Sequence, residues 1–473
     1  MRTPKKSATR PIPRPAKRPG HEEIWRRVTR ELADDLAVDA LARDRAGKNP
    51  DDEVARLQEA GLPALLTPPG PALRGSDWQA ACGVIREISA ADSSIGELLA
   101  HHYVLSWSGR FLGAAAAPDG EREAPEAPDT TDAPERLDVP GALEVRTARE
   151  RWLLAGGIEP AGGGGPGLTL TPSGSGWLLD GRRAFDSGVT VADRLVVGAR
   201  CAATGDVLVV LVDPAHPGVF TEAGGDRVGQ RLAGAGNVNF DGVPVERGQV
   251  LGTLPHDEHA VAPFTTLAPL ALRLVLVQVG LGIAEGALAE ARDISRATEA
   301  APFAPGHFSA AAAFSTGSFS AGRFTPGSYA ADPAVGAVAY PAGADQDPYL
   351  LLMYGELATA THAAAAVVER ATDALARGLR AEGSLGVEER ADIAVLVAAA
   401  EAVTSRAAIL VTTRILELVD AARAAEEPGG GPGLDRFWRN ARVLTAHSSP
   451  SHRLRDIGDH YLHGPRPQLT TLP

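Results

Sequence analysis

The sequence contains few cysteines and has no excess of positive charge. Only two cysteines, Cys82 and Cys201, occur among its 473 residues. They fall in different predicted domains, which argues against a disulfide framework and fits a reducing cytoplasm. The 59 acidic residues outnumber the 46 basic ones and give a formal charge of −13. This balance argues against nucleic acid as the main partner.

No long hydrophobic run is free of charge. The most apolar stretches are 261–291, interrupted by Arg273 and Glu285, and 391–418, interrupted by Glu401 and Arg406. These charges would be costly in lipid, so we expect core helices and no membrane span. Residues 1–20 are basic and rich in proline but have no apolar centre. They predict a disordered tail and not a secretory signal.

The usual nucleotide and metal motifs are also missing. In the segment 274–286, LVLVQVGLGIAEG, the third glycine comes one residue late and the periodicity is helical. The glycines at 162–165 lead into a strand, so no helix N-terminus is available there for a pyrophosphate. His256-Asp257-Glu258-His259 and the pair His101-His102 lack the spacing of metal ligands, so we expect no metal site.

The middle of the chain has the pattern of β-strands. Between Gly176 and Val245, short β-rich runs alternate with Ser-Gly, Asp-Gly and Asp-Pro turns. The continuous apolar run from Leu208 to Val212 is stopped by Asp213-Pro214. A compact antiparallel β domain of roughly a hundred residues is therefore expected, and we place it at 139–255.

Amphipathic or apolar helices are predicted on both sides of this β domain. A chain of this length needs two or three domains. We expect a tail at 1–20, an N-terminal helical domain at 21–138, the β domain at 139–255 and a C-terminal helical bundle at 256–473. The predicted helices cover 21–46, 50–66, 76–89, 93–112, 265–298, 349–378, 387–424 and 434–460.

Two segments have the composition of insertions. Residues 113–138 are rich in Ala, Pro, Asp and Glu and lack apolar periodicity, which predicts a mobile surface insertion. Residues 302–348 are rich in Ala, Gly and Ser, with an aromatic residue every five or six positions. This spacing matches neither a strand nor a regular helix, so a low-complexity loop and an ordered lid over a substrate entrance both stay open.

Four strings in this order resemble the acyl-CoA dehydrogenase superfamily. They are Leu98–Tyr103, Phe185–Gly188 followed by Ala192–Leu195, Gly229–Arg231, and Leu434–Arg442. Together they resemble the branch that contains dibenzothiophene monooxygenase, over residues 22–465 without the two insertions. The resemblance implies an α+β fold with an N-terminal helical domain, a middle antiparallel β-barrel domain and a C-terminal four-helix bundle.

The same resemblance separates two chemistries. An acyl-CoA dehydrogenase needs a carboxylate base, which many members carry in a Tyr-Glu-Gly string near the C-terminus. Here the corresponding residues 445–452 read TAHSSPSH and contain no glutamate. An FAD-dependent dehydrogenase would therefore need a displaced base, for which Glu356 and Glu401 are candidates.

The oxygenase branch implies a different set of partners. Its members are the oxygenase halves of two-component systems that use reduced FMN, or alternatively FAD, from a separate NAD(P)H:flavin reductase. With O2 they form a C4a-(hydro)peroxide, which oxygenates a small organic substrate at sulfur, nitrogen or carbon. We expect this function in a cytoplasmic homotetramer. A catalytically degenerate binding protein is a further alternative, because Gly157, Gly225 and Leu444 replace residues that are common in the family.

Three catalytic residues are carried over from the family motifs. His102 matches the histidine of the family's Gly-Tyr-His-Tyr-like string, and His447 matches the second histidine of its Thr-His-Thr-Leu-His string. Histidine donates or accepts protons near neutral pH. Ser187 matches the Ser or Thr that hydrogen-bonds near flavin N5 and O4. A turn between strands would also explain Ser187-Gly188.

The same motifs predict the flavin-binding residues. Phe185 would border the flavin ring, next to Ser187 and Gly188. Arg423 and Arg439 stand where the family uses C-terminal helix residues for the phosphate. Arginine suits bidentate phosphate binding, although a surface salt bridge is a common alternative.

Overall fold

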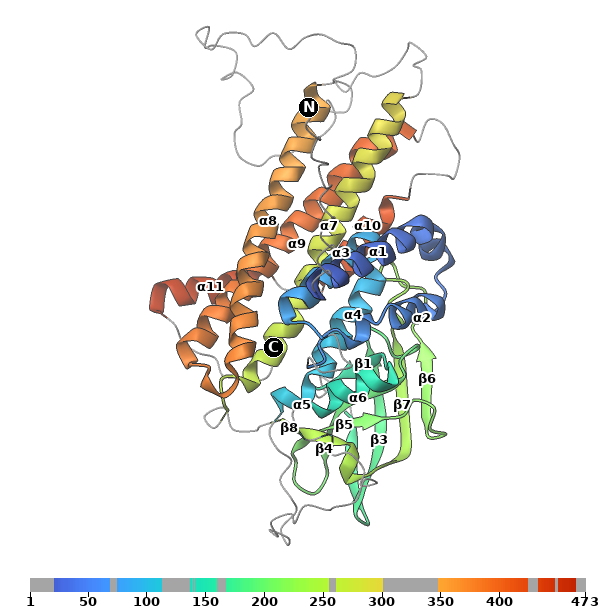
Figure 1. The fold of residues 1–473 in the computed structure, drawn as a ribbon, viewed down its shortest axis with the longest axis vertical. Helices are drawn as coiled ribbons and strands as arrows, with labels where there is room; N and C mark the ends of the chain where they lie inside the picture. Colours follow the sequence, from blue (N-terminus) through green and yellow to red (C-terminus); the bar gives the residue numbers. More distant parts are fainter. Residues whose placement is uncertain are drawn as a thin grey trace, which may run out of the picture.

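The computed structural model describes residues 21–68, 75–112, 137, 139, 141–159, 167–254, 261–300, 348–423, 433–446 and 450–464. Three long helices stand side by side, short N-terminal helices pack along them, and a β-sheet lies at one end (Figure 1). The predicted tail 1–20, His447, and almost all of the two predicted insertions lie outside the described residues.

The N-terminal helices follow the predicted order. They are α1 (His21–Ala46), α2 (Asp51–Glu59), the short 3-10 helix η1 (Leu62–Ala64), α3 (Trp78–Ala91), α4 (Ser93–Ser106) and α5 (Ser108–Phe111). The Asp77 side chain accepts a hydrogen bond from the Ala80 N–H at the start of α3, and Asp92 caps α4 in the same way. Nearly every residue of α4 is buried, because α7 packs on one side of it and β1 on another.

The middle domain begins with a helix that the sequence pattern did not predict, α6 (Ala142–Glu150). Its strands are β1 (Leu154–Gly157), β2 (Thr169–Ser173), β3 (Gly176–Phe185), β4 (Arg194–Cys201), β5 (Val207–Val212), β6 (Val219–Ala223), β7 (Gly236–Val245) and β8 (Val250–Leu254). The strand order is β6-β7-β3-β2-β4-β5-β8, with β1 also paired to β4. The pairs β1–β4 and β2–β4 are parallel, so the sheet is mixed and not wholly antiparallel.

Both faces of the sheet centre are covered. On β4, Leu195 and Val197 belong to one apolar cluster, while Val196 belongs to the other, as the two-residue period of a strand requires. All six residues of β5 are buried. This explains the continuous apolar run seen in the sequence, since a strand covered on both faces has no polar side.

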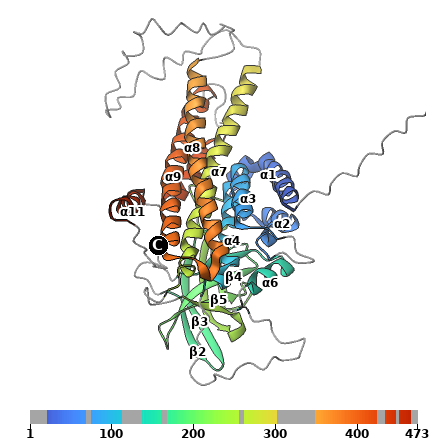
Figure 2. The ribbon, with the colours of Figure 1, turned by 60° about the vertical axis from the view of Figure 1, so that its left-hand side comes forward.

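The C-terminal part is a helical bundle. After the 3-10 helix η3 (Thr265–Leu267) come α7 (Ala268–Ala300), α8 (Pro348–Ala381), the 3-10 helix η5 (Glu382–Ser384), α9 (Val387–Arg423), α10 (Asp435–Ala446) and α11 (Pro450–His463). Figure 2 shows α7, α8 and α9 running side by side, with the sheet beyond one end of them. The last predicted helix is thus two helices, α10 and α11.

Three described helical segments are long and apolar enough, by length and composition alone, to cross a membrane. They are Thr265–Arg296, Leu350–Ser384 and Val387–Glu417, and their most apolar windows are 78%, 28% and 44% buried inside the chain. Within the bundle, Arg273 of α7 forms an ion pair with Glu401 of α9 at 2.7 Å. The expectation of no membrane span stays a prediction. The low burial of the second window leaves apolar surface on α8.

Candidate functional site

The turn after β3 carries the predicted flavin-binding string. Gly188 has a φ of +79°, and its N–H donates a hydrogen bond to the Ala233 carbonyl at 2.7 Å. A Cβ atom at position 188 would lie 2.7 Å from the Ala155 Cβ and 3.5 Å from the Leu98 Cδ2. Only glycine fits this conformation and this space. The turn is therefore wedged between β1 and α4, where the middle and N-terminal domains meet.

Ser187 leaves a polar atom without a partner in this turn. Its residue is 2% exposed, and its Oγ has no hydrogen-bond partner among the described residues. A buried hydroxyl without a partner is costly, which points to a ligand or water that completes it. Phe185 is buried beside it, and the Arg183 guanidinium lies 4.9 Å from the centre of its ring. Phe185, Ser187 and Gly188 thus lie together in this turn, and their contact with a flavin ring stays a prediction.

A hydrogen-bond network holds the loop that supports this turn. Gln230 is 1% exposed and has a φ of +51°. Its N–H donates to Asn440 Oδ1 at 2.7 Å, and Asn440 Nδ2 donates to Ser93 Oγ at 2.8 Å. Ser93 and Ser94 in turn donate to Gln230 Oε1. This closed set ties α4, the 229–234 loop and α10 to one another.

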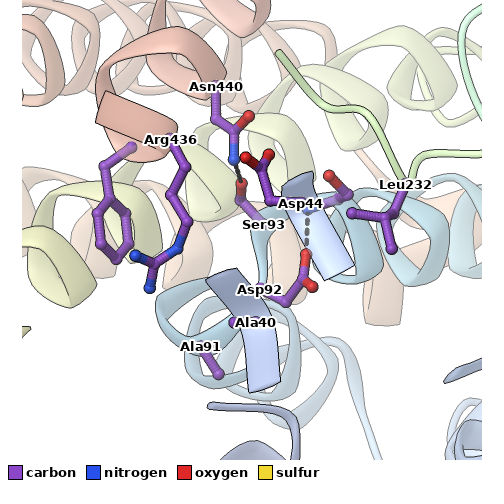
Figure 3. Close-up of a pocket in the computed structure, with 10 residues that line it drawn as sticks. Ala40, Asp44, Ala91, Asp92, Ser93, Leu232, Arg436 and Asn440 are labelled. Atoms are coloured by element: carbon purple, nitrogen blue, oxygen red, sulfur yellow. Dashed lines mark hydrogen bonds between the residues drawn. The ribbon is translucent and has the colours of Figure 1, made fainter. Parts of the chain in front are cut away.

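Figure 3 shows where this network lies. Asn440 projects from α10 toward Ser93 at the start of α4, and Leu232 and Asp44 lie nearby. The cavity among them measures about 10 Å³, which is the lower limit for a single water molecule. It is therefore a water-sized space in the supporting network and not a flavin pocket.

His102 is held by backbone groups on both sides of its ring. Nδ1 accepts a hydrogen bond from the Leu154 N–H at 2.9 Å, which places the ring proton on Nε2, facing the Pro63 carbonyl at 2.8 Å. Burial lowers the pKa of His102 to about 4. Proton exchange at His102 would thus require one of these hydrogen bonds to break. Its predicted catalytic role stays a prediction.

Glu97 and His101 form a second group on α4. The Glu97 side chain is 7% exposed, and its Oε1 lies 3.9 Å from the His101 Nε2, one helical turn away. The other oxygen, Oε2, has no partner among the described residues. Burial raises the pKa of Glu97 to about 8 and lowers the pKa of His101 to about 4. Asp186, in the turn after β3, is close enough to act on both groups electrostatically.

Of the two arginines predicted to bind the flavin phosphate, Arg439 already has hydrogen-bond partners in the chain. The Arg439 guanidinium donates to Asp44, to Asp435 at 2.9 Å and to the Val228 carbonyl at 2.8 Å. A phosphate would meet a guanidinium whose Nε, Nη1 and Nη2 each already donate a hydrogen bond. Arg423 is the last residue of α9, and its side chain lies outside the described residues, as does all of His447. Both roles stay predictions.

The candidate bases for a dehydrogenase lie elsewhere. Glu401 is buried in the bundle between Arg273 and Arg453, at 2.7 Å and 3.0 Å. Glu356 is exposed on α8. Glu401 thus belongs to an ion-pair group with two arginines inside the bundle.

Sequence reasoning missed Glu97 and His101 as members of this region. The motif comparison aligned the neighbouring His102, whereas the 3.6-residue helical period places Glu97 and His101 on one face together with Ser94. The signal was present in the spacing Ser-x-x-Glu-x-x-x-His. Only the position of α4 against the turn shows that this face matters. Among the described residues, no group of three or more His, Cys, Asp or Glu side chains could hold a metal ion.

Known proteins resemble this chain along nearly its whole length. It is 27% identical over 445 residues to a probable FMNH2-dependent monooxygenase, SfnC, of Pseudomonas putida, covering 93% of this chain and 95% of that one. The FMN-bound structure of TdsC, a dibenzothiophene monooxygenase of Paenibacillus sp. A11-2, is 26% identical, with a TM-score of 0.74 over 95% of this chain and 100% of that one. TdsC has also been solved with FMN and indole. No family model matches the chain.

The fold likeness extends to the dehydrogenases. Butyryl-CoA dehydrogenase of Megasphaera elsdenii is 16% identical, with a TM-score of 0.65 over 94% of this chain and 99% of that one. The resemblance and the α+β fold class predicted from the motifs are confirmed. The flavin-dependent oxygenase chemistry and the use of FMN, also predicted from the motifs, are confirmed by the relatives.

Proposed function

We propose that this flavin-dependent monooxygenase with the acyl-CoA dehydrogenase fold is the oxygenase half of a two-component system. It takes reduced FMN from a separate NAD(P)H:flavin reductase and uses O2 to oxygenate a small organic molecule at sulfur, nitrogen or carbon. The observation that carries the proposal is the buried, unpartnered Ser187 Oγ in the turn between β3 and β4.

The residues of this turn fit a flavin ring edge. The Ser187 hydroxyl supplies a hydrogen bond that no described residue completes, and Gly188 lets the backbone approach closely. Phe185 supplies an apolar edge for the ring. Reduced FMN, when bound, supplies the electrons that activate O2. The chain supplies position, a dry surface and hydrogen bonds.

Proton handling falls to His101 more readily than to His102. Both nitrogens of His102 are already bonded to backbone groups. His101 is partly exposed and has a carboxyl group one turn away. Because burial lowers its pKa to about 4, His101 is neutral at physiological pH and can accept a proton. His447, if it reaches this site, would add a second such group.

The bundle suits assembly of several copies. The most apolar window of Leu350–Ser384 is only 28% buried within one chain, and Leu351 and Leu352 of α8 are exposed. Apolar surface of this kind is commonly covered by another subunit. We propose a cytoplasmic homotetramer joined through the bundle. The free, buried Cys82 and Cys201 suit a reducing compartment.

The test is oxygen transfer from O2 under single-turnover conditions. The protein is mixed anaerobically with reduced FMN and then with 18O-labelled O2 in the presence of indole. We expect one labelled oxygen atom in the product by mass spectrometry, and stopped-flow absorbance should show flavin oxidation at a rate unlike that of free flavin. Unlabelled product, or flavin oxidation identical to that in buffer, would contradict the proposal.

Two variants localise the effect. Ser187→Ala should weaken FMN binding about tenfold, because one hydrogen bond to a buried ligand is lost. The matched control is Ser173→Ala, at an exposed serine of β2. His447→Ala, read in the same stopped-flow trace, tests whether that residue reaches the flavin. An unchanged FMN affinity in Ser187→Ala would remove Ser187 from the site.

A further inference from the structure

Glu97 differs from the other buried acidic residues of the described chain. Each of the others has an arginine nitrogen within 4 Å: Asp44 has Arg439, Glu53 and Asp92 have Arg43, Glu144 has Arg110, and Glu401 has Arg273 and Arg453. Glu97 has only His101, at 3.9 Å. Burying a carboxyl group without a cation is costly, so a purely structural role does not account for Glu97.

The two oxygens of Glu97 have different surroundings. Oε1 is the atom closest to the His101 Nε2, while Oε2 is buried and without a partner. A proton on Oε1 would face His101 and leave Oε2 as a hydrogen-bond acceptor. The nearest cation, Arg227, uses its Nη1 to donate to the Asp186 carbonyl at 2.8 Å. Oε2 is thus the free acceptor of this group.

The group lies next to the turn that holds the flavin-binding residues. Leu98, adjacent to Glu97, would contact a Cβ atom at Gly188, and Asp186 precedes Ser187 directly. Glu97 therefore comes from the N-terminal domain and Ser187 from the middle domain, and each brings one unpartnered oxygen to the same domain interface. Leu98, Ala155 and Phe185 make the surroundings mostly apolar.

We infer that Oε2 of Glu97 accepts a hydrogen bond from the substrate, and that the substrate is a small, largely apolar molecule carrying an N–H or O–H donor. A thioether such as dibenzothiophene has no such donor and would leave Oε2 buried and unpaired. A site built around one hydrogen bond rejects an analogue that lacks it. This inference rests on the proposed function, because it places the substrate beside the flavin turn.

Indole and benzothiophene test whether binding requires an N–H donor, because they have nearly the same shape and only indole has one. Their dissociation constants are measured by calorimetry with oxidised FMN present and without flavin, conditions in which no turnover occurs. Wild-type protein should bind indole at least about tenfold more tightly than benzothiophene. An equal affinity for the two, or no binding of indole, would overturn the inference.

Variants at position 97 assign the effect to the carboxyl group. Glu97→Gln keeps a carbonyl oxygen and should keep the preference for indole. Glu97→Leu removes the acceptor and should bind the two compounds within about twofold of each other. If the leucine variant does not fold, Glu97→Met serves the same purpose. A preference for indole that survives in the folded apolar variant overturns the inference.

Flavin affinity keeps the two proposals apart. If the wild-type protein does not bind FMN, the proposed function is refuted. The titrations without flavin would still decide the role of Glu97. Normal FMN binding together with no discrimination between the two compounds would refute only the inference. Unchanged FMN affinity in Glu97→Gln and Glu97→Leu would place Glu97 at the substrate and not at the flavin.

Discussion

Asn440→Ala removes the side chain that joins α10 to the 229–234 loop, which supports the turn after β3. In the native protein, Asn440 accepts from the Gln230 N–H at 2.7 Å and donates to Ser93 Oγ at 2.8 Å. Both partners are buried. The Gln230 N–H would lose its acceptor, whereas the Ser93 hydroxyl would still donate to Gln230 Oε1 at 3.0 Å.

The cost can be worked out from these bonds. A buried donor without an acceptor costs about 1–3 kcal/mol, and the second, weaker loss costs roughly 0.5–1.5 kcal/mol. The neighbouring cavity of about 10 Å³ would grow and admit a water molecule, which returns part of this energy. We therefore expect the 229–234 loop to be destabilised by about 2 kcal/mol.

Hydrogen–deuterium exchange measures this loss locally, which matters because a chain of several domains need not unfold in one step. A cost of 2 kcal/mol corresponds to roughly 30-fold faster exchange at Gln230. The control is Arg442→Ala, at an exposed residue of the same helix, which should leave that rate unchanged. Unaltered exchange in Asn440→Ala would refute the reasoning about the network.

The same variant tests the link to the flavin site. The loop accepts the N–H groups of Gly188 and Thr190 through the carbonyls of Ala233 and Gly234. A loosened loop should therefore weaken FMN binding as well. Faster exchange with unchanged FMN affinity would mean that the turn holds its shape without this support.

Three other perturbations give separate readouts. Gly188→Ala should abolish FMN binding in a fluorescence titration and lower the unfolding free energy by about 2 kcal/mol or more, because φ is positive and an added Cβ would lie 2.7 Å from Ala155. Gly225→Ala, whose Cβ would meet no atom within 4 Å, should change neither quantity. His102→Phe leaves the Leu154 N–H and the Pro63 carbonyl unpaired and should cost about 2–5 kcal/mol in urea unfolding; a loss below 1 kcal/mol would contradict the bonding described. Burial raises the pKa of Glu97 to about 8. Between its ordinary pKa near 4.5 and about 8, the Glu97 carboxyl is protonated in the folded state and ionised in the unfolded state. The unfolding free energy therefore falls as the pH rises through this range. Glu97→Gln should be more stable than wild type at pH 9 and lose this advantage at pH 4.5, and parallel pH profiles of the two proteins would disprove the shift.

Several features followed from the sequence alone. The helices at 21–46 and 387–424 were predicted almost to the residue, because their apolar positions recur with a helical period and Gly20, Gly47 and Gly386 adjoin their ends. Leu208–Val212 was predicted as a strand from its continuous apolar run, which Asp213-Pro214 ends. Helix α6 was missed, because Ala142–Glu150 is short and carries little apolar periodicity.

The oxygenase class could be predicted because short strings such as Phe185–Gly188 and Gly229–Arg231 are read directly, whatever surrounds them. The hydrogen-bond partners of these strings could not be predicted from the sequence. The pairing of the Gln230 N–H with Asn440 joins positions 210 residues apart. A local pattern does not encode such a distance.

The two histidines of α4 show most clearly which properties the sequence determined and which the tertiary structure decided. The sequence determined that His101 and His102 lie on a helix, and that one of them matches a family histidine. Only the tertiary structure decided that the Leu154 and Pro63 backbone groups occupy both nitrogens of His102, and that no described arginine pairs with the buried Glu97 within 4 Å. Hydrogen-bond partners and desolvation depend on which segments meet in space. The packing between domains determines these contacts, whereas the helical period is a local property of the sequence.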